Sequence, residues 1–371
     1  MDYEQLKREL KNQKVEMTPD ERIKAYTRGE EVDCLPYFLN APEAAFADIF
    51  GYTTKQMNDI DVMIDIISRA SKEFDYSGIY VGLGLRTLGI ALGSEAFYPE
   101  HGMDYLTSFV LKDYLDFDKI KDKEVSKNKM LLGMLEDAKL LKKTFPDMAI
   151  ATGVSGPITV AAAIRPLDLI LRDTVKNPEL LNSLLDLCVE RSLEWVKMFC
   201  DEFGPVATSI ADPVTCIDIL SKKQFINISM PYLEKLIIGI KKITGMEPNM
   251  HICGKTRPVW ENIKKMNLSG VSVDNCEDLS EAKRVFGESM MIIGNVPPVD
   301  VMKEGSIDDV INACRECIEK AGDSKCGYQL STGCQIPIGT PRENVEAFIY
   351  AARKYGRQAK IGVMPRGITL E

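Results

Sequence analysis

One histidine and two cysteines near the C-terminal end of the sequence have the residue types and spacing of a metal site. His251 and Cys253 end a short apolar run, and alternate residues of a strand point to the same side, so these side chains should project together. Cys334 follows another strand-like run, in a loop shaped by Gly333 and Pro337. One imidazole and two thiolates with an open fourth position are typical of catalytic zinc. The alternative is a buried histidine beside cysteines that pack as small apolar residues.

Short apolar runs alternate with longer amphipathic stretches along the whole chain. Eight runs are found, at residues 35–39, 78–82, 148–153, 206–211, 249–253, 270–274, 290–295 and 327–331. Helical patterns separate them, for example at residues 258–266, 280–286, 307–321 and 341–355. Strands that alternate with helices predict a parallel sheet. With eight such units and no sign of a second core, we expect an α/β (β/α)8 TIM barrel that forms a single domain over residues 1–371.

Two segments exceed what a minimal barrel requires. Residues 1–30 precede the first run and predict an N-terminal helical extension, in which Thr18 and Glu21 form a capping box around Pro19. Residues 83–146 form a long connection after the second run. We expect this insertion to carry extra helices that cover the barrel mouth. No glycine-rich phosphate fingerprint follows the first run, which disfavours a dinucleotide-binding fold.

Acidic residues at the ends of the predicted strands are further candidates, because active sites of barrels form where strands end and loops begin. Asp212 follows the fourth run, and Asp274 ends the sixth, with Glu277 close behind it. Asp212 and Asp274 are candidate catalytic residues that could orient a ligand, hydrogen-bond a zinc-bound histidine or occupy a fourth zinc position. The alternative for each aspartate is capping of a helix N-terminus.

Two polar residues at the same predicted edge are candidates for binding a cofactor or substrate. Asn295 ends the seventh run, and Gln335 follows Cys334 directly.

A redox role is not expected for Cys314 and Cys317, although their spacing is that of a CxxC motif. Both cysteines fall on the apolar face of a predicted helix, which favours packing in the core.

The composition of the chain limits which kinds of partner and which cellular compartment we expect. The net charge of −9 and the lack of basic blocks argue against a nucleic-acid partner. No apolar run approaches the length of a membrane span, and the N-terminus is too charged for a signal peptide. Ten cysteines without a secretory signal predict reduced thiols in the cytoplasm, where metal or catalytic roles outrank disulfides. Together with 17 methionines, they fit an anaerobic setting.

Over nearly its whole length the sequence resembles the uroporphyrinogen decarboxylase superfamily, and within it the corrinoid-dependent methyltransferases. The resemblance is carried by residues 29–36, 156–159, 212–213, 251–254, 293–296, 333–337 and 340–344. It implies that His251, Cys253 and Cys334 bind zinc, and that Glu277 serves as an acidic ligand when substrate is absent. It also implies a methyl-corrinoid protein as a separate partner, which carries the corrinoid (cobalamin) cofactor, and a small thiol such as coenzyme M as methyl acceptor.

The resemblance leaves alternatives open. The family also contains enzymes that work in the other direction, demethylating a methyl donor onto the Co(I) corrinoid protein. Decarboxylases of the superfamily carry an Arg-Gln-Ala-Gly-Arg-Tyr stretch that grips propionates, whereas residues 38–43 here read Phe-Leu-Asn-Ala-Pro-Glu, without arginine. A decarboxylase-like enzyme that binds no metal is the other alternative. A pure corrinoid carrier is disfavoured, since no cobalamin-binding module surrounds His251.

Overall fold

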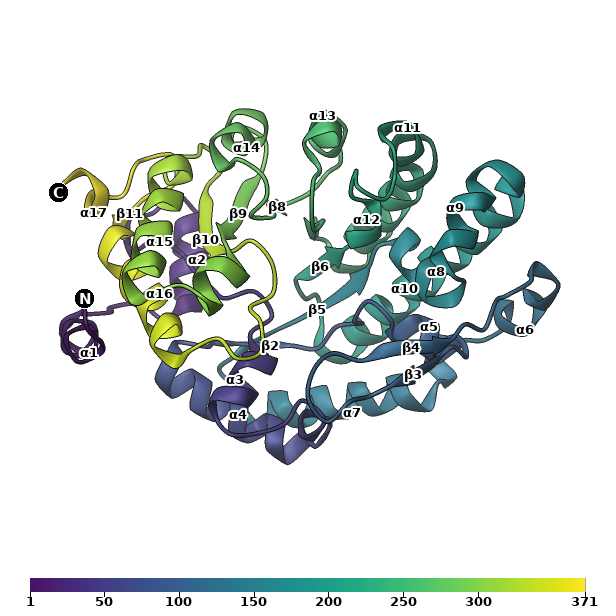
Figure 1. Ribbon diagram of the computed structural model, residues 1–371, viewed down its shortest axis with the longest axis horizontal. Coiled ribbons are helices and arrows are strands. Elements are labelled where there is room, and N and C mark those ends of the chain that lie inside the picture. Colours follow the sequence, from purple (N-terminus) through teal and green to yellow (C-terminus); the bar gives the residue numbers. More distant parts are fainter. Residues whose placement is uncertain (371) are drawn as a thin grey trace. The chain divides into compact units, whose positions relative to one another are not determined.

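Strands alternate with helices along the chain in the computed structural model, which describes residues 1–370 (Figure 1). The chain divides into two compact units, one of residues 1–77, 100–102 and 270–370 and one of residues 78–99 and 103–269. Each unit contains its own set of parallel strands, as expected where helices connect successive strands. Within residues 1–370, no helix combines the length and apolar content that crossing a bilayer requires.

Four parallel strands form the sheet of the unit that contains residues 103–269. They are neighbours in chain order: β2 (Gly78–Tyr80), β5 (Ala149–Ser155), β6 (Thr208–Ala211) and β7 (Asn249–His251). The runs predicted at residues 78, 148, 206 and 249 are thereby confirmed. Because parallel strands end at the same edge, Ser155, Ala211 and His251 are partners in register. The residues that follow these strand ends therefore share one edge of this sheet.

Long amphipathic helices cover this sheet. Trp195 of α10 (Pro178–Phe203) is fully buried, and its indole N–H donates to Thr152 Oγ1 of β5 at 2.9 Å. A buried indole usually finds such a partner, so this bond fixes the helix against the strand. The helices after β5 are α8 (Pro157–Ile164), α9 (Leu167–Lys176), α10 (Pro178–Phe203), α11 (Lys222–Gln224), α12 (Met230–Thr244) and α13 (Trp260–Ile263).

The long connection of residues 83–146 carries the extra helices that its sequence predicts. It contains α5 (Thr87–Leu92), the antiparallel pair β3 (Glu95–Phe97) and β4 (Tyr105–Ser108), α6 (Asp118–Lys121) and α7 (Lys129–Thr144). That this connection covers a barrel mouth stays a prediction.

The other unit has three parallel strands, β8 (Gly270–Ser272), β9 (Met291–Val296) and β10 (Tyr328–Thr332). They confirm the last three predicted runs. Helices α14 (Leu279–Phe286), α15 (Ile307–Ala321) and α16 (Arg342–Tyr355) follow these strands in turn. Cys314 and Cys317 are buried on α15, which confirms their packing role. Helices α3 (Glu43–Ile49), α4 (Ile60–Phe74) and α17 (Arg366–Thr369) also belong to this unit.

The N-terminal extension folds into α1 (Tyr3–Asn12) and α2 (Pro19–Thr27). The predicted capping box begins α2: the Glu21 N–H donates to Thr18 Oγ1 at 3.3 Å, and the Thr18 N–H donates to Glu21 Oε2 at 2.9 Å. The reciprocal bonds satisfy two backbone donors that the helix itself leaves without partners.

The strand predicted at residues 35–39 is wrong. The strand at this place is β1 (Val32–Cys34), which pairs antiparallel with β11 (Arg357–Ala359). The apolar segment after it forms one isolated parallel bridge, between Tyr37 and Leu330 of β10. Pro36 has no N–H and cannot complete a ladder, although its carbonyl accepts from the Leu330 N–H at 3.0 Å. The run therefore lies beside β10 without becoming a strand.

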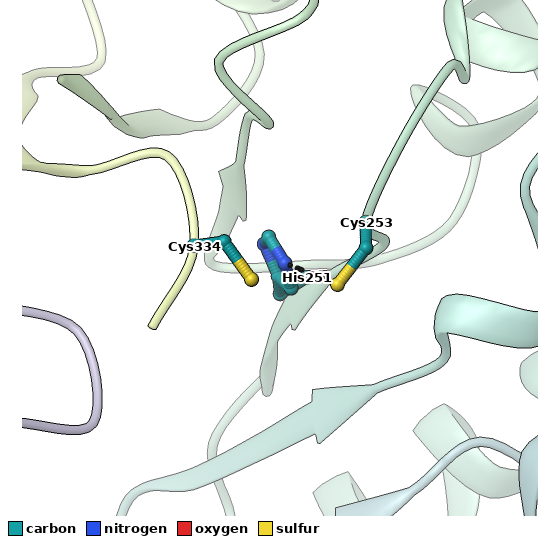
Figure 2. Close-up of side chains that lie close together, drawn as sticks. All are labelled: His251, Cys253 and Cys334. Carbon is teal, nitrogen blue, oxygen red and sulfur yellow. Dashed lines mark hydrogen bonds between the residues drawn. The ribbon is translucent and has the colours of Figure 1, made fainter. Parts of the chain in front are cut away.

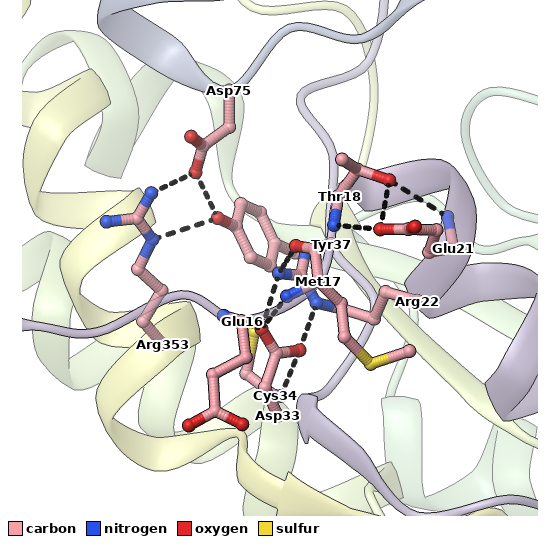
Figure 3. Close-up of polar contacts among 10 residues, drawn as sticks. All are labelled: Glu16, Met17, Thr18, Glu21, Arg22, Asp33, Cys34, Tyr37, Asp75 and Arg353. Carbon is pink, nitrogen blue, oxygen red and sulfur yellow. Dashed lines mark hydrogen bonds and ion pairs between the residues drawn. The ribbon is translucent and has the colours of Figure 1, made fainter.

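A buried ion pair anchors the N-terminal extension (Figure 3). Arg22 of α2 is 1% exposed and binds Asp33 of β1 through two bonds, Nε to Oδ1 at 2.7 Å and Nη2 to Oδ2 at 3.0 Å. A second group lies beside it, where Tyr37 donates to Asp75 at 2.5 Å and Arg353 pairs with the same carboxylate. The charges of this cluster are therefore matched within the protein.

Candidate metal and catalytic site

His251 and Cys253 lie at the end of β7, as the strand pattern predicts. The His251 ring nitrogen Nε2 lies 3.1 Å from Cys253 Sγ, so the two side chains point to one place. Gly254 follows with φ +73°, a left-handed conformation that glycine adopts without strain. The chain thus turns away immediately after Cys253 and leaves both ligand atoms at the strand end.

Cys334 is positioned by the glycine before it. Gly333 ends the β10 ladder, and a Cβ atom on it would lie 2.5 Å from the backbone nitrogen of Asn275. Only glycine permits such a close approach of two loops. Gln335 follows in the same loop and is partly exposed. The shaped loop that the sequence indicates is therefore present, and it fixes the backbone on which Cys334 stands.

The ligand atoms of His251, Cys253 and Cys334 all lie within 4.8 Å of one another (Figure 2). Ligands at the usual zinc–nitrogen and zinc–sulfur distances around a tetrahedral ion lie roughly 3.5 Å apart, so small side-chain shifts would seat an ion here. The donor set of one nitrogen and two sulfurs suits zinc better than magnesium or calcium, which take oxygen ligands. These three residues therefore fit the predicted metal.

Asp212 lies next to this strand end and is fully buried. Its backbone N–H donates to the His251 carbonyl at 2.9 Å, and its Oδ1 accepts from the Thr159 hydroxyl at 2.6 Å. Burial raises the pKa of Asp212 to about 7, although the bonds from Thr159 partly offset this effect. The other oxygen, Oδ2, has no hydrogen-bond partner. A buried carboxylate with one unused acceptor fits a residue that meets a ligand.

The loop after β8 holds the remaining acidic candidates. The Asp274 carboxylate accepts from the Cys276 N–H at 2.9 Å, which is a local turn contact, and the N-cap of the following helix α14 is Asp278. Asn295 is buried, and its amide donates to the carbonyls of Asp274 at 3.1 Å and Glu277 at 2.9 Å. Asn295 therefore ties the loop to β9. The cluster of three ligand atoms does not include Glu277.

Three polar residues of the same sheet were missed by sequence reasoning. Tyr80 ends β2, and its hydroxyl lies 2.9 Å from Ser209 Oγ of β6. A tyrosine and a serine in separate apolar runs carry no local signal of such a contact, because it depends on strand register. Ser155 Oγ, at the end of β5, is buried without a hydrogen-bond partner.

Comparison with known proteins places this chain in a family. Residues 18–355 match the family described as Uroporphyrinogen decarboxylase (URO-D). The chain belongs to this family. Membership agrees with the resemblance on which the three metal-ligand candidates rest, and it spans both compact units.

Relatives within the uroporphyrinogen decarboxylase family include methyltransferases and decarboxylases. The chain is 24% identical to methylcobamide:CoM methyltransferase MtaA of Methanosarcina barkeri, over 92% of this chain and 99% of that protein. It is 25% identical to the methylated-thiol–coenzyme M methyltransferase of Methanosarcina mazei, over 91% of this chain and 90% of that protein. It is 23% identical to the chloroplastic uroporphyrinogen decarboxylase of Nicotiana tabacum, over 88% and 84%.

A solved structure confirms the fold class. A methyltransferase from Methanosarcina mazei superposes with a TM-score of 0.75 at 22% identity, covering 92% of this chain and 99% of that one. With the family match, this likeness establishes the α/β fold of the TIM-barrel type that the alternating strands and helices predict.

Proposed function

We propose that this protein is a zinc-dependent methyltransferase of a corrinoid methyl-transfer system. It would move a methyl group between a methylated corrinoid on a separate protein and a thiol acceptor such as coenzyme M. The observation that carries the proposal is the convergence of one imidazole and two thiols within 4.8 Å. The end-to-end similarity to methylcobamide:CoM methyltransferases supports the same reaction.

The three ligand residues suit the activation of a thiol. A zinc ion held by them would deprotonate a bound thiol and keep its sulfur nucleophilic at neutral pH. His251 contributes a neutral nitrogen, and Cys253 and Cys334 contribute thiolates, so their two negative charges would balance those of the ion. The fourth position would be left to substrate. Glu277 is proposed to occupy that position when substrate is absent.

The neighbouring polar residues have proposed roles in holding the reactants. Asp212 contacts the backbone of His251 and keeps one buried oxygen for a ligand, so we assign it to the catalytic site. Asp274 and Asn295 shape the loop after β8, and Gln335 stands beside Cys334. Because of these positions, we also propose that substrate or corrinoid contacts Asp274, Asn295 and Gln335.

The decarboxylase alternative is less well supported. Residues 38–43, which lack the arginines of the decarboxylases, lie against the end of β10: the Asn40 N–H donates to Thr332 Oγ1 at 3.2 Å, and the Ile336 N–H donates to the Asn40 carbonyl at 3.2 Å. This segment therefore stands beside the Cys334 loop without a cation. Binding of a substrate with several carboxylates would require positive charge there.

The proposal is tested by methyl transfer from free methylcobalamin to a panel of thiols, with zinc quantified in the same preparations. We expect about one zinc per chain and a thiol-dependent change of the methylcobalamin spectrum. Cys334→Ser should lose zinc and lower the rate by on the order of a hundredfold or more, since even residues that only support metal ligands cost 10–100-fold.

Cys326→Ser is the matched control, because Cys326 is a partly exposed cysteine outside the cluster. It should keep both zinc and activity. A wild-type protein without zinc would overturn the proposal. Zinc without turnover of any thiol would overturn the thiol-acceptor direction and favour demethylation of a methyl donor onto the Co(I) corrinoid protein.

A further inference from the structure

The side chain of Asn295 holds the turn that follows β8. Its amide nitrogen Nδ2 donates to the Asp274 carbonyl at 3.1 Å and to the Glu277 carbonyl at 2.9 Å. An amide nitrogen has two hydrogens, so these two bonds use both of them. The Asp274 carbonyl also accepts from the Glu277 N–H at 3.1 Å, which closes the turn. Asn295 therefore binds both ends of the turn of residues 274–277.

Cys317 of α15 contacts the other end of the same amide. Its thiol donates to Asn295 Oδ1 at 3.7 Å, and both residues are buried, so water does not compete for this bond. Burial raises the pKa of Cys317 to about 11, so the sulfur keeps its hydrogen at neutral pH and can donate it. Both polar atoms of the Asn295 side chain thus have partners within the protein, which fixes the orientation of the amide.

The turn is in direct contact with the loop that carries Cys334. A Cβ atom on Gly333 would lie 2.5 Å from the backbone nitrogen of Asn275 and 2.8 Å from its Cβ. The Gly333 N–H donates to the Val296 carbonyl at 2.8 Å, so the residue before Cys334 is also bound to the residue after Asn295. A shift of the turn would therefore displace Gly333, and Cys334 with it.

We propose that Asn295 is a positioning residue for the metal ligand Cys334, and that Cys317 orients Asn295. Asn295 acts on Cys334 through the turn of residues 274–277, and this role is separate from the substrate contact proposed above. The inference rests on the proposed function for the ligand role of Cys334. All of these residues belong to the compact unit that contains residues 270–370, so the contacts lie within one unit.

The first test is amide hydrogen exchange on the full-length chain after removal of zinc, which requires no activity. Asn295→Asp keeps nearly the same shape but places an oxygen where the nitrogen now faces two carbonyls. Exchange of the Cys276, Glu277 and Gly333 N–H groups should rise about tenfold or more, since two hydrogen bonds are lost. Exchange within α16 of the same unit should stay as in wild type, which separates release of the turn from a general loss of stability.

The second test is the dissociation constant for zinc, measured by competition with a chelator. Asn295→Asp should raise it about 10–100-fold, the usual cost of removing a residue that supports a metal ligand. Cys317→Ala should raise it about threefold to tenfold, because a thiol is a weak donor. Cys317→Ser keeps a donor at the same place and should retain most of the affinity.

Cys314→Ala is the matched control, because Cys314 is buried on the same helix and the substitution removes the same sulfur atom one turn away from Cys317. It should change the dissociation constant by less than about twofold. Equal effects of Cys317→Ala and Cys314→Ala would mean that only packing is lost, and would overturn the role of Cys317.

Unchanged exchange of the turn in Asn295→Asp would overturn the role of Asn295. If Asn295→Asp does not fold, exchange in the two alanine variants decides instead, because only Cys317→Ala should release the turn. A wild-type protein that binds no zinc would overturn the proposed function, whereas the exchange measurements would still show whether Asn295 holds the turn against Gly333.

Discussion

Two aspartates in this protein, the partly buried Asp33 and the fully buried Asp212, have opposite surroundings. Asp33 of β1 receives five hydrogen-bonding contacts, from Arg22 Nε and Nη2 and from the backbone N–H groups of Glu16, Met17 and Cys34. Asp212 receives bonds from Thr159 at Oδ1 only, and its Oδ2 has no hydrogen-bond partner. Both oxygens of the Asp33 carboxylate thus accept hydrogen bonds, whereas only one oxygen of the Asp212 carboxylate does.

The pKa values follow from these surroundings. For Asp33, burial raises the pKa, but the hydrogen bonds and charge of Arg22 outweigh it and lower the pKa to about 2. For Asp212, burial dominates and raises the pKa to about 7. A saturated buried carboxylate serves the fold, and an unsaturated one at a strand end indicates a site for a ligand. The role proposed for Asp212 in the catalytic site rests on this difference between the two carboxylates.

The largest expected effect comes from breaking the saturated pair. Arg22→Met removes the buried cation and leaves the partly buried Asp33 without its partner, which should lower the free energy of unfolding by about 3–5 kcal/mol. Urea unfolding followed by circular dichroism measures this change. Arg28→Met is the matched control, because the Arg28–Glu30 pair lies on the surface and should contribute little. Equal losses of unfolding free energy in both variants would show that the Arg22–Asp33 pair stabilises the protein no more than a surface ion pair does.

A smaller effect is expected from the pH dependence of Asp33. Because its folded pKa lies below the ordinary value, the carboxylate stabilises the protein above about pH 4, and this contribution is lost as the pH falls toward 2. The contribution amounts to about 2 kcal/mol at neutral pH. Asp33→Asn should therefore be destabilised at pH 7 and should approach wild type near pH 2. Unfolding midpoints measured across this range test the expectation, and a difference that is constant with pH would contradict it.

The sequence predicted those features that depend on local pattern. The capping box of Thr18 and Glu21, the core cysteines of α15 and seven of the eight apolar runs follow from residue spacing, and the structure has them. The three metal-ligand candidates were found because strand alternation and a glycine-bounded loop are visible in sequence.

Features that depend on strand register or on contacts between distant residues could not be predicted from the local residue pattern. Residues 35–39 are apolar because they pack beside β10. They do not form a strand, because Pro36 interrupts the ladder. The contact of Tyr80 with Ser209 joins residues that are 129 positions apart and depends on how β2, β5 and β6 are aligned. The Arg22–Asp33 pair is equally invisible, since arginine and aspartate are common on surfaces.

The smallest expected effect on stability concerns Asp212. In Asp212→Asn the amide oxygen can still accept from Thr159, and the amide nitrogen replaces the oxygen that has no partner. The substitution also removes the need to bury a charge, so the free energy of unfolding should change by less than about 1 kcal/mol. Methyl transfer should nevertheless fall while zinc content is retained, because the carboxylate belongs to the site in the proposed function. A loss of stability as large as that of Arg22→Met would mean that the second oxygen of Asp212 supports the fold, and the two aspartates would then be alike.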